Sequence, residues 1–218
     1  MPNALILGAS RVLGLGLAKE LAGRGWTVTG TVRREEDKGG LEATGAGAVL
    51  ADITDGSSLI GLKAAVSQLD LLFVNAGISE PADVEMIDEE GIGHLFMTNA
   101  VAPIRAALFL LDRMVANGMV AFMSSRMGSV ALTMGENKAM YRASKAALNM
   151  LTRAMLPRFG TDRPVLSFHP GWVATDMGGP GADLDVETSV RGMADVIEQR
   201  RGTPGSAFVD YSGAALAW

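Results

Sequence analysis

The chain has 218 residues, of which 48% are hydrophobic and 20% are charged, and its net charge is −5. This composition fits one globular domain spanning residues 1–218, and the acidic balance argues against nucleic acid or an anionic membrane as a partner. The absence of cysteine excludes disulfides, thiolate metal sites and cysteine nucleophiles, and it is compatible with a cytoplasmic location.

The first predicted element is a short buried strand at residues 3–8, because its apolar run is continuous rather than alternating. The turn that follows reads Gly8-Ala9-Ser10-Arg11-Val12-Leu13-Gly14 and leads into a helix. A strand, a glycine turn and a helix start together can bind a pyrophosphate, since backbone N–H groups point at the anion and glycine lets it come close. A plain tight turn is the alternative for this stretch.

A second strand, at residues 26–32, ends in Arg33 and Arg34, where an acidic residue would bind a ribose 2′-hydroxyl. Together with Arg11, these arginines suit a 2′-phosphate. They therefore indicate NADP(H), with NAD(H) less favoured. A solvated basic corner is the alternative for each arginine.

Five further strands are predicted at residues 48–51, 71–74, 119–123, 165–168 and 207–211. Helices are predicted at residues 57–68, about 93–117 with a kink or boundary near Pro103, 138–156 and 186–200. This alternation predicts an α/β fold: a single doubly wound Rossmann domain with a mainly parallel seven-stranded sheet and helices on both faces. Ligands of such sheets bind at the carboxyl ends of the strands, where Asp52, Asn75 and Ser125 also lie.

Tyr141 and Lys145 are four residues apart in the helix predicted at 138–156, so they share one face. A phenol beside an ammonium group is a usable acid–base pair. The positive charge is expected to lower the tyrosine pKa from about 10 toward neutral pH. An ordinary helix is the alternative on this spacing alone. His94 and His169 are far apart in the sequence, so we expect no metal site.

Taken together, these motifs resemble the short-chain dehydrogenase/reductase family across essentially the whole chain. The motifs that carry the resemblance are Gly8–Gly14, Asp52-Ile53-Thr54, Asn75-Ala76-Gly77, Ser125, Tyr141-Arg142-Ala143-Ser144-Lys145 and Pro170-Gly171. Tyr141 lies sixteen positions after Ser125, which is typical of the family. The ending Phe208-Val209-Asp210-Tyr211-Ser212-Gly213, with Trp218, is similar to the compact C-factor-like or sniffer-type carbonyl reductase branch.

The resemblance implies roles for four residues. Tyr141 would act as the general acid in carbonyl reduction or as the base in alcohol oxidation, and Ser125 would hydrogen-bond the substrate oxygen. Lys145 would lower the pKa of Tyr141 and hold the nicotinamide ribose, while Asn99 would support a water-linked proton relay. Ser124 competes with Ser125 for its role, and a packing or backbone-bonding amide is the alternative for Asn99.

The resemblance also implies cofactor contacts. Asp52 and Ile53 would meet the adenine, and Val173 and Thr175 the nicotinamide carboxamide. The remaining implied contacts are Gly8, Ser10, Arg11, Val12, Leu13, Gly14, Arg33, Asn75, Ala76, Gly77, Tyr141, Lys145, Pro170 and Gly171.

Two features depart from the family pattern. Leu7 replaces the usual threonine and Val12 replaces the middle glycine of the turn, although Gly14 and Gly16 remain. A β-branched residue is disfavoured at positive φ, so Val12 bears on the affinity for the cofactor. Only about ten residues separate Thr175 from the last predicted helix, which indicates a small lid and an open pocket.

The sequence therefore favours an NADP(H)-dependent oxidoreductase that transfers a hydride between nicotinamide and a ketone, an aldehyde or a secondary alcohol. The family resemblance implies a homodimer or homotetramer formed through the two long helices. The alternative is a catalytically weak or inactive protein of this fold that senses the cofactor or acts in signalling. An epimerase or dehydratase is poorly supported, because the chain lacks the length for the added substrate region.

Overall fold

The computed structural model describes residues 1–80, 83–179 and 181–218. Their centre is a seven-stranded sheet with the order β3-β2-β1-β4-β5-β6-β7, in which every pairing between neighbouring strands is parallel. The strands are β1 (Asn3–Leu7), β2 (Thr27–Val32), β3 (Gly47–Leu50), β4 (Leu69–Val74), β5 (Met114–Met123), β6 (Pro164–His169) and β7 (Gly205–Asp210). The predicted sheet is confirmed.

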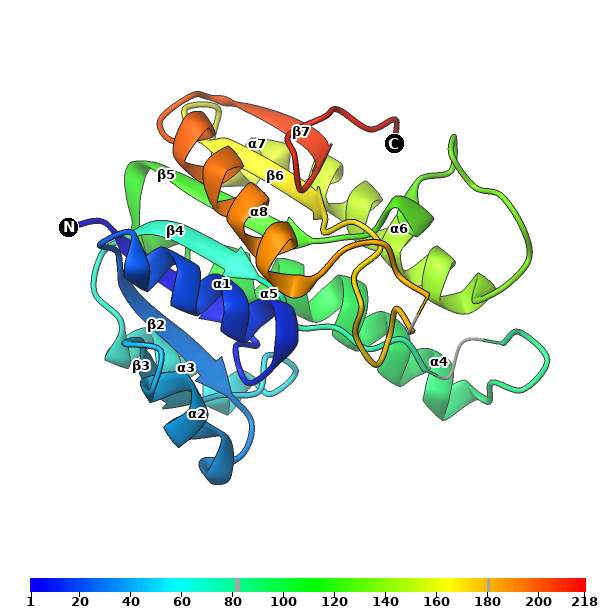
Figure 1. Cartoon of the computed structure of the whole chain (residues 1–218), viewed down its shortest axis with the longest axis horizontal. Coiled ribbons are helices and arrows are strands. Elements are labelled where there is room, and N and C mark those ends of the chain that lie inside the picture. Colours follow the sequence, from blue (N-terminus) through cyan, green and yellow to red (C-terminus); the bar gives the residue numbers. More distant parts are fainter. Residues whose placement is uncertain (81–82, 180) are drawn as a thin grey trace.

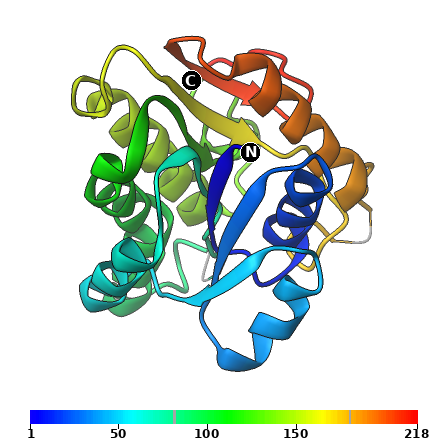
Figure 2. The same ribbon diagram turned by 90° about the vertical axis from the view of Figure 1, so that its left-hand side faces the viewer.

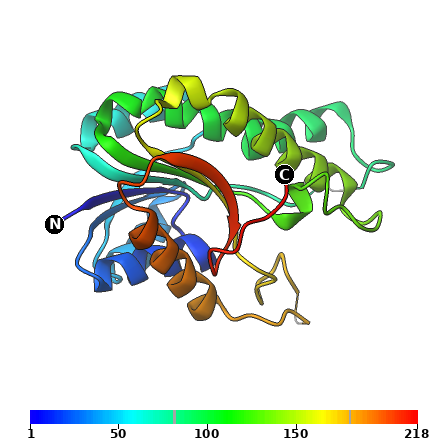
Figure 3. The same ribbon diagram turned by 90° about the horizontal axis from the view of Figure 1, so that it is seen from above.

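Helices cover both faces of this sheet (Figures 1 and 3). The helices are α1 (Val12–Gly23), α2 (Lys38–Glu42), α3 (Gly56–Ala65), α4 (Glu89–Phe96), α5 (Ala102–Phe109), α6 (Ala139–Ala154), α7 (Leu156–Phe159) and α8 (Val186–Arg200). Short 3-10 turns lie at Glu35–Asp37, Leu111–Arg113 and Arg126–Gly128, and Met97–Val101 forms a π-helical turn between α4 and α5.

Two hydrophobic cores lie on the two faces of the sheet. One packs α1 and α8 against the sheet through residues such as Leu21 and Met193. The other packs α3, α5 and α6 through residues such as Leu62 and Leu148. Figure 2 shows these two helix layers on opposite sides of the strands. Because both faces are covered, the strands read as continuous apolar runs in the sequence.

The order of the strands reverses at β1: β2 and β3 lie on one side of it, and β4 to β7 lie on the other. This reversal creates the position for a ligand. Strand β1 pairs with β2 on one side and with β4 on the other, and Leu7 lies opposite Val74 at the end of the second pairing. The segments that follow these two residues therefore begin side by side. In an open α/β sheet, the crevice at such a switch point is where ligands bind.

The prediction of a long helix at residues 93–117 was wrong at the C-terminal end. Helix α5 stops at Phe109, and β5 already begins at Met114 rather than at Met119. The first part of β5 pairs only at Leu69, and the register then shifts before Leu71. Because Ala116 and Asn117 are exposed in this irregular part, the segment lacks the apolar pattern of a buried strand. Pro103 sits in the first turn of α5, where a helix tolerates proline.

One continuous helical segment, Glu89–Phe109, is long and apolar enough to cross a membrane by length and composition alone. Half of its apolar window is buried inside the fold, as is usual for a core helix. Its buried residues include Leu95, Ala100 and Ala106. The packing favours the core-helix interpretation.

Candidate active site

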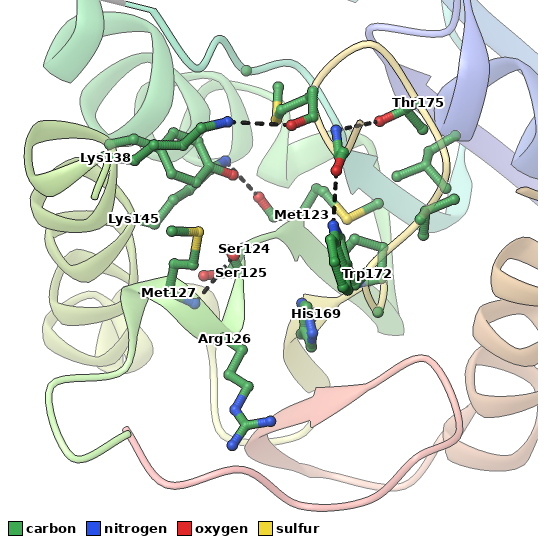
Figure 4. A pocket seen from close by; sticks show the side chains of 18 of the residues that line it. Met123, Ser124, Ser125, Arg126, Met127, Lys138, Lys145, His169, Trp172 and Thr175 are labelled. Atoms are coloured by element: carbon green, nitrogen blue, oxygen red, sulfur yellow. Dashed lines mark hydrogen bonds between the residues drawn. The ribbon is translucent and has the colours of Figure 1, made fainter. Parts of the chain in front are cut away.

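A cavity of about 790 Å³ opens at the carboxyl edge of the sheet. Its walls come from the segments after β1, β4, β5 and β6 and from the first turns of α6. Figure 4 shows side chains from these segments facing one another across the cavity. The topology therefore brings together residues that are far apart in the sequence.

Helix α6 presents its buried face to this cavity. Tyr141, Lys145 and Asn149 are each one turn apart along that face, and all three are buried. Lys145 Nζ donates a hydrogen bond of 2.9 Å to the carbonyl oxygen of Met123, and it lies 5.9 Å from the centroid of the Tyr141 ring. The predicted shared face of Tyr141 and Lys145 is confirmed.

Burial controls the protonation of this pair. It raises the pKa of Tyr141 to about 12, although a hydrogen bond with Ser125 opposes the rise. Burial also lowers the pKa of Lys145 to about 8. The expectation that the tyrosine pKa moves toward neutral pH was therefore wrong for this structure, because removal of the phenol from water outweighs the hydrogen bond with Ser125. At neutral pH, Tyr141 is a neutral phenol that can donate a proton.

The two adjacent serines after β5 have different partners. The Ser124 hydroxyl donates a 2.7 Å hydrogen bond to Asn149 Oδ1. Ser125 begins the turn Arg126–Gly128, where its hydroxyl accepts a 3.2 Å hydrogen bond from the Met127 N–H. Since Ser125 is also the serine that hydrogen-bonds Tyr141, it is the better placed of the two to share a substrate oxygen with the phenol.

Asn99 lies in the π-helical turn Met97–Val101 and is fully buried. Its side chain accepts from the Ile78 N–H at 2.8 Å and donates to the Ile78 carbonyl at 2.7 Å. It also donates to the Ser144 hydroxyl at 2.9 Å, on the face of α6 between Tyr141 and Lys145. These contacts are those of a backbone-bonding amide that supports the site from behind; Asn99 does not line the cavity.

The turn between β1 and α1 packs tightly. A side chain at Gly14 would place its Cβ 2.1 Å from the carbonyl oxygen of Gly8, so only glycine fits there. Gly8 has φ 87°, and a Cβ at this position would lie 2.9 Å from the backbone of Ala76. At the start of α1, Arg11 makes no capping hydrogen bond through its side chain. The first N–H groups of that helix therefore remain as anion donors.

Val12 adopts φ 46° in this turn. A β-branched side chain at positive φ is a strained conformation, and such strain concentrates at functional sites. The sequence-based concern about Val12 is therefore correct in its physical basis. The turn nevertheless forms, because Asn75 Nδ2 donates a 2.7 Å hydrogen bond to the Gly8 carbonyl and Thr31 Oγ1 accepts one of 2.9 Å from the Gly8 N–H.

The arginines near the end of β2 differ in whether they are already paired with an acidic side chain. Arg34 pairs with Asp37 at 3.0 Å and with Glu36 at 3.4 Å, and together with Arg11 and Arg33 it lowers the pKa of Asp37. Among the described residues, Arg11 and Arg33 make no ion pair. These two, rather than Arg34, have their charges available for a phosphate.

The other predicted cofactor residues divide into lining and supporting groups. Asp52 follows β3 and bonds its own loop, accepting from the Thr54 N–H at 2.8 Å, while Ile53 is buried in the core. The predicted cofactor residues that line the cavity are Arg11, Val12, Leu13, Asn75, Gly77, Tyr141, Lys145, Pro170, Gly171, Val173 and Thr175. Those outside the lining are Gly8, Ser10, Gly14, Arg33, Asp52, Ile53 and Ala76.

Gly77 leaves a recess inside the cavity. A Cβ at this position would lie 3.2 Å from both Asn99 Oδ1 and Lys145 Nζ. The absence of a side chain there keeps the lysine accessible from the cavity. A ribose hydroxyl has the size and hydrogen-bonding capacity for such a recess.

Sequence reasoning missed most of the apolar walls. Trp172, Met127, Leu132, Met134, Met177 and Ile78 line the cavity. Within the loop after β6, Trp172 Nε1 donates to the Gly178 carbonyl at 2.8 Å, and Lys138 Nζ joins the segment before α6 to this loop by donating to the Met177 carbonyl at 3.2 Å (Figure 4). Trp172 is 55% exposed and Met134 is 79% exposed, so the cavity mouth is open and apolar.

His169, at the end of β6, also lines the cavity. Burial lowers its pKa to about 4, and Arg126 adds to this effect while Asp210 opposes it. Its Nδ1 is buried without a hydrogen-bond partner among the described residues. At neutral pH the ring is uncharged. Within the described residues, no group of three histidine or acidic side chains is arranged to hold a metal ion.

Comparison with known proteins gives a consistent result. Residues 2–183 match the family model described as short chain dehydrogenase. The structure is similar to a carbonyl reductase from Pseudomonas aeruginosa PAO1 in complex with NADP, with 41% identity, a TM-score of 0.93 and 100% of both chains covered. It is also similar to a short-chain dehydrogenase/reductase from Burkholderia multivorans with bound NADP, with 34% identity, a TM-score of 0.94 and coverage of 100% and 99%.

A third relative is named as a signal and not as a reductase. The protein called C-signal, from Myxococcus xanthus, is 40% identical over 161 residues, which cover 69% of this chain and 93% of that protein.

Proposed function

This chain belongs to the short-chain dehydrogenase family, and from that premise we propose that it is an NADP(H)-dependent reductase of ketones or aldehydes. The observation that carries the proposal is the buried group of Ser125, Tyr141 and Lys145 at one wall of an open, largely apolar cavity. The reverse reaction, oxidation of a secondary alcohol, would use the same residues.

In this proposal, the chain's own groups act on the substrate oxygen. Ser125 donates a hydrogen bond to the carbonyl and stabilises the charge that develops on its oxygen. Tyr141 donates the proton that converts this oxygen to a hydroxyl. Its raised pKa of about 12 supports reduction, because the phenol keeps its proton at neutral pH. Lys145 holds its position through the Met123 carbonyl.

The residues present fit a nicotinamide dinucleotide. The close-packed turn at Gly8 and Gly14 and the uncapped start of α1 suit the pyrophosphate, and the recess at Gly77 suits a ribose near Lys145. The cofactor supplies the hydride. The unpaired charges of Arg11 and Arg33 support NADP(H) over NAD(H), since a 2′-phosphate would compensate them. Two of the similar structures contain NADP, which favours the same choice.

The cavity walls bear on the substrate. Methionine, leucine and tryptophan side chains surround the candidate catalytic group, and the lid segment near Trp172 is short. A flexible methionine surface accommodates varied shapes. We therefore propose a carbonyl compound with a bulky apolar body.

A second candidate function rests on Val12. Strain in the glycine turn opposes tight cofactor binding, and the similar C-signal protein carries a signalling name. The corresponding proposal for this chain is a sensor that binds the cofactor weakly and turns over slowly or not at all. The ordered Ser125, Tyr141 and Lys145 group favours the reductase.

Activity with a carbonyl panel tests the reductase proposal. NADPH oxidation should accompany reduction of apolar ketones or aldehydes by the purified protein, and Tyr141→Phe should slow it about 1,000-fold without loss of NADPH binding. Cofactor binding without turnover of any panel member would favour the sensor. Equal turnover by Tyr141→Phe would contradict the assigned acid.

The assembly and location stay predictions. On the two long helices expected to form a subunit interface, Ala100, Ala106 and Ala107 are buried in the core, whereas Met97 and Met150 are on the surface. A homodimer or homotetramer would therefore use Met97 and Met150. We expect a cytoplasmic protein.

A further inference from the structure

We propose that Asn149 is a positioning residue for Ser125, because its buried amide clamps both ends of the turn that carries the Ser125 hydroxyl. The inference rests on the proposed reductase function. Asn149 lies two helical turns beyond Tyr141 and makes no contact with the cavity.

The clamp consists of two hydrogen bonds. Before the turn, Asn149 Oδ1 accepts a hydrogen bond of 2.7 Å from the Ser124 hydroxyl. After Ser125, Asn149 Nδ2 donates a hydrogen bond of 3.1 Å to the Gly128 carbonyl. Since a carbonyl oxygen can only accept, the amide nitrogen must face Gly128 and the amide oxygen must face Ser124.

Apart from this clamp, the hydrogen bonds that hold the turn are its own and one from the neighbouring strand. The Gly128 N–H donates to the Ser125 carbonyl at 2.8 Å, and the Met127 N–H donates to the Ser125 hydroxyl. On the strand side, the Ser124 N–H donates to the Phe168 carbonyl at 2.8 Å. Asn149 is 3% exposed, so its two hydrogen bonds form away from competing water.

The clamp fixes the serine relative to the other two groups. Gly128 packs against the backbone of Lys145 so closely that a Cβ there would lie 2.7 Å from the lysine carbonyl carbon. Asn149 is the next buried position along α6 from Lys145 that reaches this turn. It therefore sets the approach of Ser125 to Tyr141, with which Ser125 shares a hydrogen bond.

A double-mutant cycle tests the assignment. Asn149→Ala should lower kcat for carbonyl reduction about tenfold, corresponding to the loss of both hydrogen bonds of its amide, with the KM for NADPH unchanged. Ser125→Ala should lower kcat about 100-fold. The double variant should match Ser125→Ala alone, because Asn149 acts through Ser125. The same fold loss in both backgrounds, or no loss from Asn149→Ala, would overturn the inference.

Thr152→Ala is the matched control. Thr152 is buried on the same helix face, and among the described residues its hydroxyl bonds only the Leu148 carbonyl of its own helix. This variant should lose stability but keep kcat. If Asn149→Ala does not fold, Ser124→Ala removes one of the two hydrogen bonds. Its loss in kcat should be about threefold and should disappear in the Ser125→Ala background; a loss that persists there contradicts the inference.

A measurement without turnover separates this inference from the proposed function. Exchange of the Met127 and Gly128 amide hydrogens, followed by NMR, should be about tenfold faster in Asn149→Ala than in the parent protein, while the Leu5 amide in β1 is unaffected. Faster exchange in a protein without reductase activity would support the clamp and reject the function. Unchanged exchange would reject the clamp whatever the activity.

Discussion

The α6 wall and the β1–α1 turn form two sides of the same cavity, and they differ in how well their residues suit their conformations. On the α6 side, Tyr141, Lys145 and Asn149 are buried on a regular helix. On the turn side, Val12 is held at φ 46°, which a β-branched residue rarely adopts. On the α6 side, the positive φ of 55° is confined to Lys138, before the helix begins, and the candidate catalytic residues lie in regular helix. In the candidate phosphate site, the strained residue stands inside the turn itself.

We therefore expect the α6 side to determine the rate of the chemical step and the turn side to determine the affinity for the cofactor. Changes on the α6 side should alter turnover while leaving cofactor binding nearly intact. Changes on the turn side should alter binding and stability while leaving the chemical step nearly intact. Catalytic rate and binding free energy are therefore the two quantities to compare.

The largest effect is expected from Tyr141→Phe. Loss of the phenolic hydroxyl removes the proposed proton donor, so kcat for carbonyl reduction should fall about 1,000-fold. Steady-state kinetics at saturating NADPH measures this, and calorimetry should find NADPH affinity within about twofold of the parent. A large loss of affinity would mean that the two sides of the cavity are not separable.

Acid should lower the stability of the folded protein through the buried His169 in the cavity wall. The unfolded chain binds a proton near pH 6.5, whereas the buried ring resists it until about pH 4, so stability falls as the pH drops through this window. The loss approaches about 3 kcal/mol by pH 4. Urea unfolding at pH 7 and pH 4 measures it. His169→Gln should remove that part of the slope, and the same change at the exposed His94 should not.

Arg33→Ala should weaken NADPH binding about tenfold and leave NADH binding unchanged. The variant removes one of the two unpaired positive charges proposed to face the 2′-phosphate, which NADH lacks. Arg34→Ala is the control, since Arg34 is already paired with Asp37. Calorimetric titration measures both variants. Equal losses for NADPH and NADH would contradict the arginine assignment.

Val12→Gly should produce the smallest effect, and in the favourable direction. Glycine adopts positive φ without strain, so the free energy of unfolding should rise by about 1 kcal/mol, and NADPH should bind more tightly. Urea unfolding and calorimetry check these outcomes, with kcat expected to stay constant. A loss of stability would show that the valine side chain packs favourably enough to offset its backbone conformation.

The sheet could be predicted from sequence because its strands are apolar on both faces. The start of β5 could not, because Ala116 and Asn117 are exposed and the pairing there is irregular. The sequence pattern instead predicted that the preceding helix continues to residue 117. Boundaries were otherwise close, as with α8, where Val186–Arg200 matches the predicted range.

The candidate site was predictable where it depends on spacing along one element. The positions of Tyr141 and Lys145 follow from helix geometry, but their pKa values follow from burial, which spacing does not contain. The walls around Trp172 and Met134 were missed because their loops meet only in the folded chain. The link from Asn149 to Ser124 likewise joins residues far apart in sequence.

Calorimetric titration of the purified protein with NADPH and with NADH measures the cofactor preference itself. We expect micromolar binding of NADPH and binding of NADH that is at least about tenfold weaker. NADH binding as tight as NADPH binding would contradict the cofactor preference. Failure of both to bind at millimolar concentration would contradict the reductase and favour a protein whose strained turn has lost the cofactor.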